Sequence, residues 1–193
     1  MIRNFHLADW LTLGNAICGV SALFAIMAYL QDGEVRQVLF ACALIVLAFV
    51  FDVFDGRAAR WRQKSSSMGR ELDSLADVIS FGVAPAVIAY GIGMNGLWDR
   101  VVLLYFVACG VSRLARYNVS AAAAVTGPTD KVKFYEGTPI TFSIVPLAIV
   151  LGLASTGPLS SLRVAGLELH YATLLFLLSG SLMISKTLRI PKL

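Results

Sequence analysis

The sequence predicts an all-α, polytopic membrane protein, and three observations support this prediction. Of its 193 residues, 58% are hydrophobic and only 15% are charged. The mean hydropathy is +0.75, and several apolar runs approach the roughly 20 residues that a helix needs to cross a bilayer. No run shows the alternation of apolar and polar residues that is typical of a membrane β-strand. The length is that of one domain, which we expect to include residues 1–193.

Apolar segments along the chain are predicted to form six transmembrane helices. The first follows the leader MIRNFHLAD, which is weakly basic and leads to no small-residue cleavage site, so we expect a retained helix. Residues 1–9 are expected to lie along the membrane interface as a short amphipathic helix. The predicted spans are residues 10–30, 37–54, 75–94, 101–114, 139–155 and 171–185.

Basic residues are distributed so that both termini are predicted to face the cytoplasm. With six spans and an inner N-terminus, only Arg36, Arg100 and Arg163 of the 16 Lys and Arg residues fall outside, in agreement with the positive-inside rule. The charge on the inner face would attract anionic lipid headgroups or nucleotide phosphates. We expect no nucleic-acid partner.

The predicted outer connections carry little chemistry. The histidines His6 and His170 are predicted on opposite sides of the membrane, so no zinc site is expected. Cysteines all lie inside apolar segments and are expected to pack as small apolar residues. Function is therefore expected at the cytoplasmic side.

The stretch DVFDGRAARWRQKSSSMGRELDSLAD, residues 52–77, concentrates carboxylates at the edges of apolar runs. Asp52 and Asp55 are three residues apart and Asp73 and Asp77 are four apart, so on helices each pair lies on one face. The polar KSSS run predicts a turn that could bring the two faces together. Carboxylates at one spot cannot all remain ionised and unpaired. Mg²⁺ or Mn²⁺ ions would resolve this because they prefer oxygen ligands, and two such ions could hold a diphosphate.

Small residues accompany both pairs. Gly56 and Ala59 follow Asp52 at helical spacing, and Gly69 lies one turn before Asp73, so a ligand or a neighbouring helix could approach the backbone closely. Arg60, one turn after Gly56, could add positive charge beside a diphosphate. Simple pairing of aspartates with nearby arginines is the alternative, and it explains one aspartate more readily than all of them together with their small neighbours.

The full pattern, Asp52-x2-Asp55-Gly56-x2-Ala59-Arg60-x8-Gly69-x3-Asp73-x3-Asp77, resembles the signature of the CDP-alcohol phosphotransferases at every position. The resemblance implies a dimeric integral membrane enzyme that transfers a phosphate-containing group from a CDP-linked donor to an alcohol and releases CMP. It also implies a set of site residues. Asp52, Asp55 and Asp73 would bind metal, Asp77 would lie near the second metal and act as general base, and Gly56, Ala59, Arg60, Gly69, Thr12 and Asn15 would surround the CDP-lipid.

The acceptor is predicted from the weaker resemblance of other stretches. SRLARYN (112–118), FYEGTPIT (134–141), LTLGNAICG (11–19) and LMISKTLRIPK (182–192) resemble the branch of the family that joins CDP-diacylglycerol to L-serine. That resemblance implies a cytoplasm-facing site in the inner membrane of a prokaryote or the endoplasmic reticulum of a eukaryote.

Arginine chemistry agrees with a serine acceptor. Arg113 and Arg116 are three residues apart, so one helical face could present both guanidinium groups to the serine carboxylate, with Tyr117 and Asn118 as polar neighbours. Alternatively, these arginines are simply the positive charges that are typical of the cytoplasmic end of a transmembrane helix. Glu136 could face the serine ammonium group or pair with a nearby lysine.

Two other functions remain open from the sequence. The same chemistry could use glycerol phosphate or an inositol compound as acceptor. A divalent-cation transporter could instead use the aspartates as its pathway, although the carboxylates cluster near the inner ends of helices and no mid-span acid occurs in the last three segments.

Overall fold

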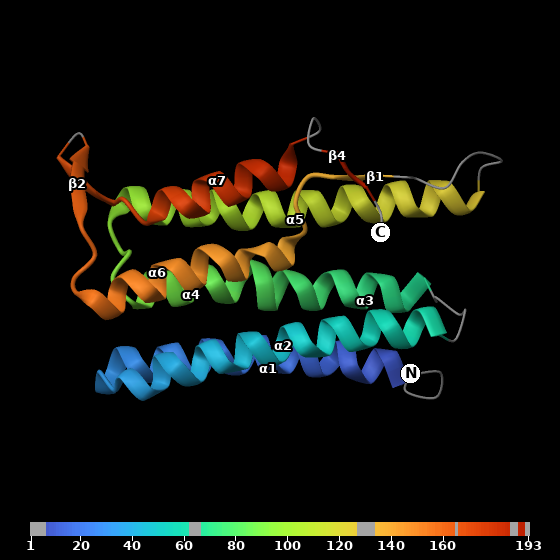
Figure 1. Ribbon diagram of the computed structural model, residues 1–193, viewed down its shortest axis with the longest axis horizontal. Helices are drawn as coiled ribbons and strands as arrows, with labels where there is room; N and C mark the ends of the chain where they lie inside the picture. Colours follow the sequence, from blue (N-terminus) through green and yellow to red (C-terminus); the bar gives the residue numbers. More distant parts are fainter. Residues whose placement is uncertain (1–6, 62–66, 127–133, 165, 186–188, 192–193) are drawn as a thin grey trace. The chain divides into compact units, whose positions relative to one another are not determined.

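The computed structural model describes residues 7–61, 67–126, 134–164, 166–185 and 189–191 (Figure 1). The chain divides into two compact units, Met1–Ile92 and Gly93–Leu193. Both units are mainly helical. Residues 1–6 of the predicted interfacial helix lie outside the described residues. Residues 7–9 form the start of the first helix, which begins at Leu7.

In the first unit, long helices pack around α1 (Leu7–Asp32). Helix α2 (Val35–Trp61) runs antiparallel to α1 along its length (Figure 1). The next stretch consists of α3 (Ser67–Asp77), the π-helix η2 (Val78–Val83) and α4 (Ala84–Gly91), which continue one another as a single rod. All three parts of this rod pack against α1.

A tight turn joins α1 to α2. Gly33 has a φ of 70°, which a residue with a Cβ rarely adopts, and its N–H donates to the carbonyl of Tyr29 at 2.8 Å. The Asp32 carboxylate accepts from the N–H of Glu34 at 2.8 Å. This geometry closes α1 and lets α2 return beside it.

The rod changes its helical winding immediately after Asp77. Within η2 the winding is wider, and the N–H of Ala84 donates to the carbonyl of Ile79, five residues back. Pro85 follows at the start of α4, where its missing N–H is tolerated. A π-turn of this kind often occurs at a functional site.

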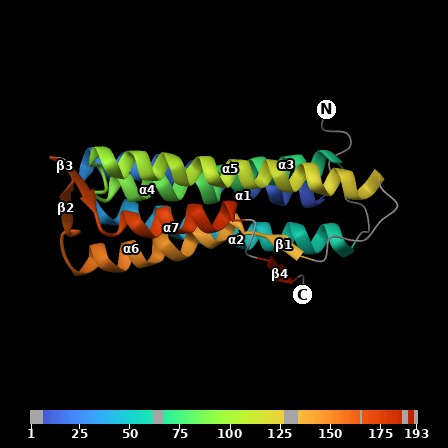
Figure 2. The ribbon, with the colours of Figure 1, turned by 90° about the horizontal axis from the view of Figure 1, so that it is seen from above.

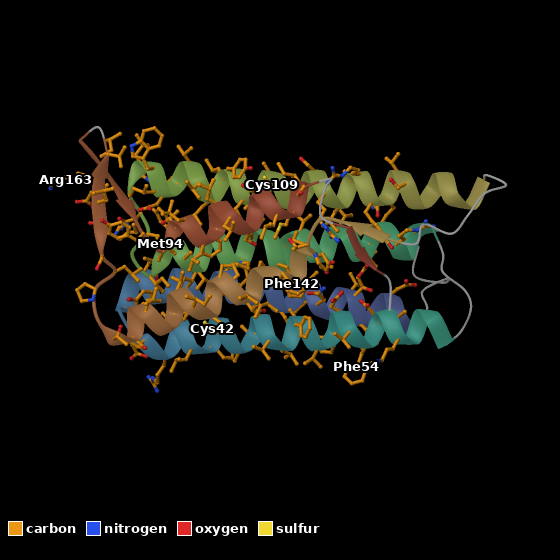
Figure 3. All side chains as sticks on the ribbon, turned by 45° about the horizontal axis from the view of Figure 1, so that its top comes forward. Cys42, Phe54, Met94, Cys109, Phe142 and Arg163 are labelled. Atoms are coloured by element: carbon orange, nitrogen blue, oxygen red, sulfur yellow. The ribbon has the colours of Figure 1, made fainter. Side chains whose placement is uncertain are left out.

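Small residues form much of the buried surface between the helices of the first unit. Ala22, Ala41, Ala48 and Ala76 are all buried. Such residues let helix backbones approach closely, as is common in membrane proteins. Many large apolar side chains point outward: Phe54, for example, projects away from α2 and is 54% exposed (Figure 3).

Three described helical stretches are long and apolar enough to cross a membrane: Ala8–Asp32, Val35–Arg57 and Met68–Gly91. The other predicted spans also fall mainly on helices: α5 (Leu97–Thr126), η3 (Ile140–Ser143) with α6 (Ile144–Thr156), and α7 (Thr173–Ile184). The prediction of an all-α membrane protein is thus supported in its coarse form.

The second unit is organised by two parallel helices. Helix α5 (Leu97–Thr126) packs beside α7 (Thr173–Ile184), as Figures 1 and 2 both show. The rings of Phe106 and Phe176 meet edge to face at 5.1 Å between centroids. The 3-10 helix η3 (Ile140–Ser143) and the helix α6 (Ile144–Thr156) lie between α5 and α7 in the sequence.

Short strands add to the predicted all-α architecture. Between α6 and α7, the strands β2 (Ser161–Val164) and β3 (Leu167–His170) form an antiparallel hairpin (Figure 2). A second antiparallel pair joins β1 (Phe134–Glu136) to β4 (Arg189–Pro191).

Candidate active site

Three of the signature carboxylates converge in the first unit. Asp52 and Asp55 lie one turn apart on α2, and Asp73 lies on α3. Each can offer an oxygen such that all three ligand atoms lie within 4.8 Å of one another. The predicted meeting of the two helical faces is therefore present, although the predicted KSSS turn falls mostly outside the described residues.

The carboxylates of this cluster, Asp52, Asp55 and Asp73, differ in their hydrogen bonds and in their burial. The Thr12 hydroxyl donates to Oδ2 of Asp55 at 2.8 Å and Asp55 is buried, whereas Asp52 and Asp73 are half-buried. Oδ1 of Asp73 is buried and has no hydrogen-bond partner among the described residues. Oxygen-only ligands, mutual repulsion and an unsatisfied buried oxygen together fit a hard divalent cation.

Asp77 is held differently from the other three. It lies at the last position of α3, is 8% exposed, and does not belong to the three-carboxylate cluster. The Asn15 side-chain amide donates to Oδ1 of Asp77 at 3.3 Å. Asp77 therefore has a different hydrogen-bond partner from Asp55, and its predicted roles as a metal neighbour and general base stay predictions.

Helix α1 packs behind the carboxylates and donates hydrogen bonds to two of them. Thr12 and Asn15 are both buried and face Asp55 and Asp77, respectively. Ser80, which was not predicted as a site residue, donates its hydroxyl to the backbone carbonyl of Asn15 at 2.9 Å. The spacing of Thr12, Asn15 and Gly19 along one helical face is the sequence signal that could have indicated this backing surface. Direct contact of Thr12 and Asn15 with a nucleotide stays a prediction.

The small signature residues are only partly described. A Cβ added to Gly56 would meet nothing within 4 Å among the described residues, so space is open beside the cluster. Gly69 is half-buried on α3. Ala59 and Arg60 lie on α2, but their side chains are outside the described part of the structure.

The predicted serine-binding residues all lie on α5, in the second unit. Arg113 is 8% exposed, Tyr117 is exposed and Asn118 is half-buried. Arg116 points its guanidinium toward the carbonyl of Ile184 at the end of α7, at 3.4 and 3.5 Å. A cation at a helix C-terminus is favourable, so Arg116 has a structural role whether or not it binds serine. The side chain of Glu136 is outside the description.

A separate buried carboxylate was not indicated by the sequence. Asp99 on α5 accepts from the Thr173 hydroxyl at 2.7 Å, the His170 N–H at 2.9 Å and the Gly96 N–H at 3.0 Å, and it lies 2.7 Å from Nδ1 of His170. Burial raises the pKa of Asp99, but the hydrogen bonds from Thr173 and His170 outweigh burial and hold it below the ordinary value. This cluster joins the hairpin to α5 and α7.

Fold and site together define a helical membrane protein with three carboxylates at one spot, a set of ligands that fits a divalent cation. A sequence model of the CDP-alcohol phosphatidyltransferase family matches residues 5–183. The chain belongs to this family.

Individual relatives carry more specific names. A CDP-diacylglycerol–serine O-phosphatidyltransferase of Saccharomyces cerevisiae is 42% identical over 203 residues, covering 100% of this chain and 72% of that protein. The enzyme of the same name from Bacillus subtilis is 37% identical over 142 residues, covering 72% of each chain. An archaetidylserine synthase of Methanothermobacter thermautotrophicus is 35% identical over 146 residues, covering 74% of this chain and 56% of that protein.

Proposed function

We propose that this chain transfers a phosphatidyl group from CDP-diacylglycerol to L-serine and releases phosphatidylserine and CMP. The convergence of Asp52, Asp55 and Asp73 within 4.8 Å is the structural observation that carries the reaction type. The names of the relatives support serine as acceptor, since they share serine although one of them names a different lipid. Family membership argues against the cation-transporter alternative.

The carboxylate cluster supplies the ligands for Mg²⁺ or Mn²⁺, and we propose two ions. Asp52, Asp55 and Asp73 would hold them, with Asp77 beside the second. Bound cations would neutralise the diphosphate of the donor and the phosphate that leaves with CMP. Open space at Gly56 would let the diphosphate approach the backbone of α2.

Asp77 is the proposed general base in a single displacement. The serine hydroxyl oxygen forms a bond to the phosphorus of the phosphatidyl group, and the bond from that phosphorus to the CMP oxygen breaks. The hydroxyl proton passes to a carboxylate oxygen of Asp77, a step for which a carboxylate within hydrogen-bond reach is suited. Trapping a labelled phosphatidyl-enzyme in the absence of serine would contradict this route.

Serine recognition is assigned to α5. Arg113 and Arg116 would bind the serine carboxylate, with Tyr117 and Asn118 as polar neighbours. Ala59, Arg60 and Gly69 would line the CDP-lipid site together with Gly56.

The membrane arrangement completes the proposal. We propose six spans, with both termini and the active site at the cytoplasm, in the inner membrane of a prokaryote or the endoplasmic reticulum of a eukaryote. Both units would form one functional domain, and the protein would act as a homodimer. The positive-inside distribution of Lys and Arg supports the orientation.

An acceptor panel tests the proposed function. Purified protein with CDP-diacylglycerol and Mn²⁺ is incubated with L-serine, glycerol 3-phosphate or inositol, and CMP and lipid products are measured. We expect CMP and phosphatidylserine with serine alone. CMP release with glycerol 3-phosphate or inositol but not serine would overturn the acceptor and leave the family chemistry intact.

A further inference from the structure

Asn15 contacts the rod that carries Asp77 at two points. Its side-chain amide donates to Oδ1 of Asp77, and its backbone carbonyl accepts from the Ser80 hydroxyl. Asn15 is fully buried. Asn15 of α1 thus forms hydrogen bonds with the rod on both sides of the junction between α3 and η2.

Gly19 allows α1 to approach η2 closely enough for these two hydrogen bonds of Asn15 to form. A Cβ at Gly19 would collide with the Ser80 hydroxyl and would lie 2.9 Å from the Cα of Ser80, closer than real Cβ atoms come. The collision with backbone could be relieved only by moving α1 away from η2. Asn15 lies one turn before Gly19, so the close approach at Gly19 brings the Asn15 amide within reach of Asp77.

The buried amide is not explained by packing alone. Its Oδ1 atom has no hydrogen-bond partner among the described residues, and a buried unsatisfied amide oxygen is unfavourable compared with an apolar side chain of the same size. The interaction that Asn15 does make is directed at Asp77. We therefore expect the unfavourable burial of Asn15 to be offset by a role in holding the Asp77 carboxylate.

We propose that Asn15 is the positioning residue for Asp77, binding one carboxylate oxygen so that the other is directed at the acceptor hydroxyl. The Asn15 amide donates to Oδ1 of Asp77, and the Asp77 side chain is itself buried. Without this donor, the carboxylate can rotate and its fraction of productive orientations falls. The inference rests on the proposed function, in which Asp77 takes the acceptor proton.

Substitution of Asn15 separates positioning from structure. Asn15→Leu keeps the side-chain size and removes the donor, and Asn15→Ala, which also lacks a donor, is a smaller second variant in case leucine prevents folding. We expect kcat to fall about 10- to 100-fold in both, with the KM for serine and the Mn²⁺ concentration for half-maximal rate little changed. Ser21→Ala, on the same helix, is the matched control and should leave kcat unchanged.

A double-mutant cycle tests whether Asn15 acts through Asp77. The rate of Asn15→Leu/Asp77→Asn should equal that of Asp77→Asn, because a positioning residue has nothing left to position. If Asp77→Asn has no measurable rate, Asp77→Glu replaces it; because the longer side chain moves its carboxylate away from the Asn15 amide, Asn15→Leu should then lower the rate less than it does in the wild type. Losses that multiply, or a normal kcat in Asn15→Leu, would overturn the proposal. Wild-type protein that releases no CMP with serine would instead overturn the proposed function.

Discussion

Two buried carboxylate sites in this protein differ in how their charge is compensated. In the second unit, Asp99 receives hydrogen bonds from Gly96, His170 and Thr173. In the first unit, three carboxylates converge, and Asp55 among them accepts from the Thr12 hydroxyl, while Oδ1 of Asp73 is buried without a hydrogen-bond partner among the described residues. The protein itself satisfies Asp99, which we expect to be structural, whereas we propose that cations compensate the charge of the cluster.

The largest expected effect follows from removing one ligand of the cluster. Asp73→Asn should lower the rate of CMP release by about 1,000-fold, because a carboxylate that stabilises the charge of the reacting phosphates is lost. Thermal unfolding should be unchanged or shifted upward, since the substitution relieves repulsion between carboxylates. A melting temperature well below that of the wild type would contradict this assignment.

Asp99 should show the opposite behaviour. Asp99→Asn keeps the size but turns an amide toward donors that need an acceptor, so the free energy of unfolding should fall by about 1–3 kcal/mol. Activity per folded molecule should stay normal. Thermal melting in detergent checks this, with exposed Glu168→Gln on the same hairpin as control.

Thr12→Val tests the hydrogen bond from the Thr12 hydroxyl to the Asp55 carboxylate of the cluster. Because the Thr12 hydroxyl orients Asp55, its loss should raise the Mn²⁺ concentration for half-maximal rate about tenfold, with kcat at saturating Mn²⁺ little changed. A metal titration of the rate provides the measurement. An unchanged titration curve would show that Asp55 needs no orientation from α1.

The smallest effect is expected from pH. The pKa of Asp99 is lowered in the folded protein, so its contribution to stability is complete above the ordinary carboxyl pKa of about 4 and is lost as pH falls through the lower folded value. The difference in melting temperature between wild type and Asp99→Asn should therefore shrink below about pH 4. A constant difference from pH 6 to pH 3 would contradict this account.

Much of the cluster could be predicted from sequence because helical periodicity is local. The spacing of Asp52 and Asp55, and of Asp73 and Asp77, predicts two faces, and the structure confirms that Asp52, Asp55 and Asp73 meet. Apolar segment lengths predicted the helices for the same reason. Each inference depends on residues within a few turns of one another.

Contacts between distant segments were harder to predict. Nothing in the spacing of the signature places Thr12 and Asn15 against Asp55 and Asp77, since that depends on the packing of α1. The π-helical winding after Asp77 was also missed. His170 was predicted to lie in an unremarkable connection, but the β2–β3 hairpin brings it to Asp99.

Direct binding of Mn²⁺ tests the central contrast between the two carboxylate sites. Purified wild-type protein, Asp73→Asn and Asp99→Asn are titrated with Mn²⁺, and bound ion is measured by electron paramagnetic resonance. We predict that wild type and Asp99→Asn bind Mn²⁺ with the same affinity and that Asp73→Asn binds at least about tenfold more weakly. Equal binding by Asp73→Asn and the wild type would contradict the assignment of the cluster to cations.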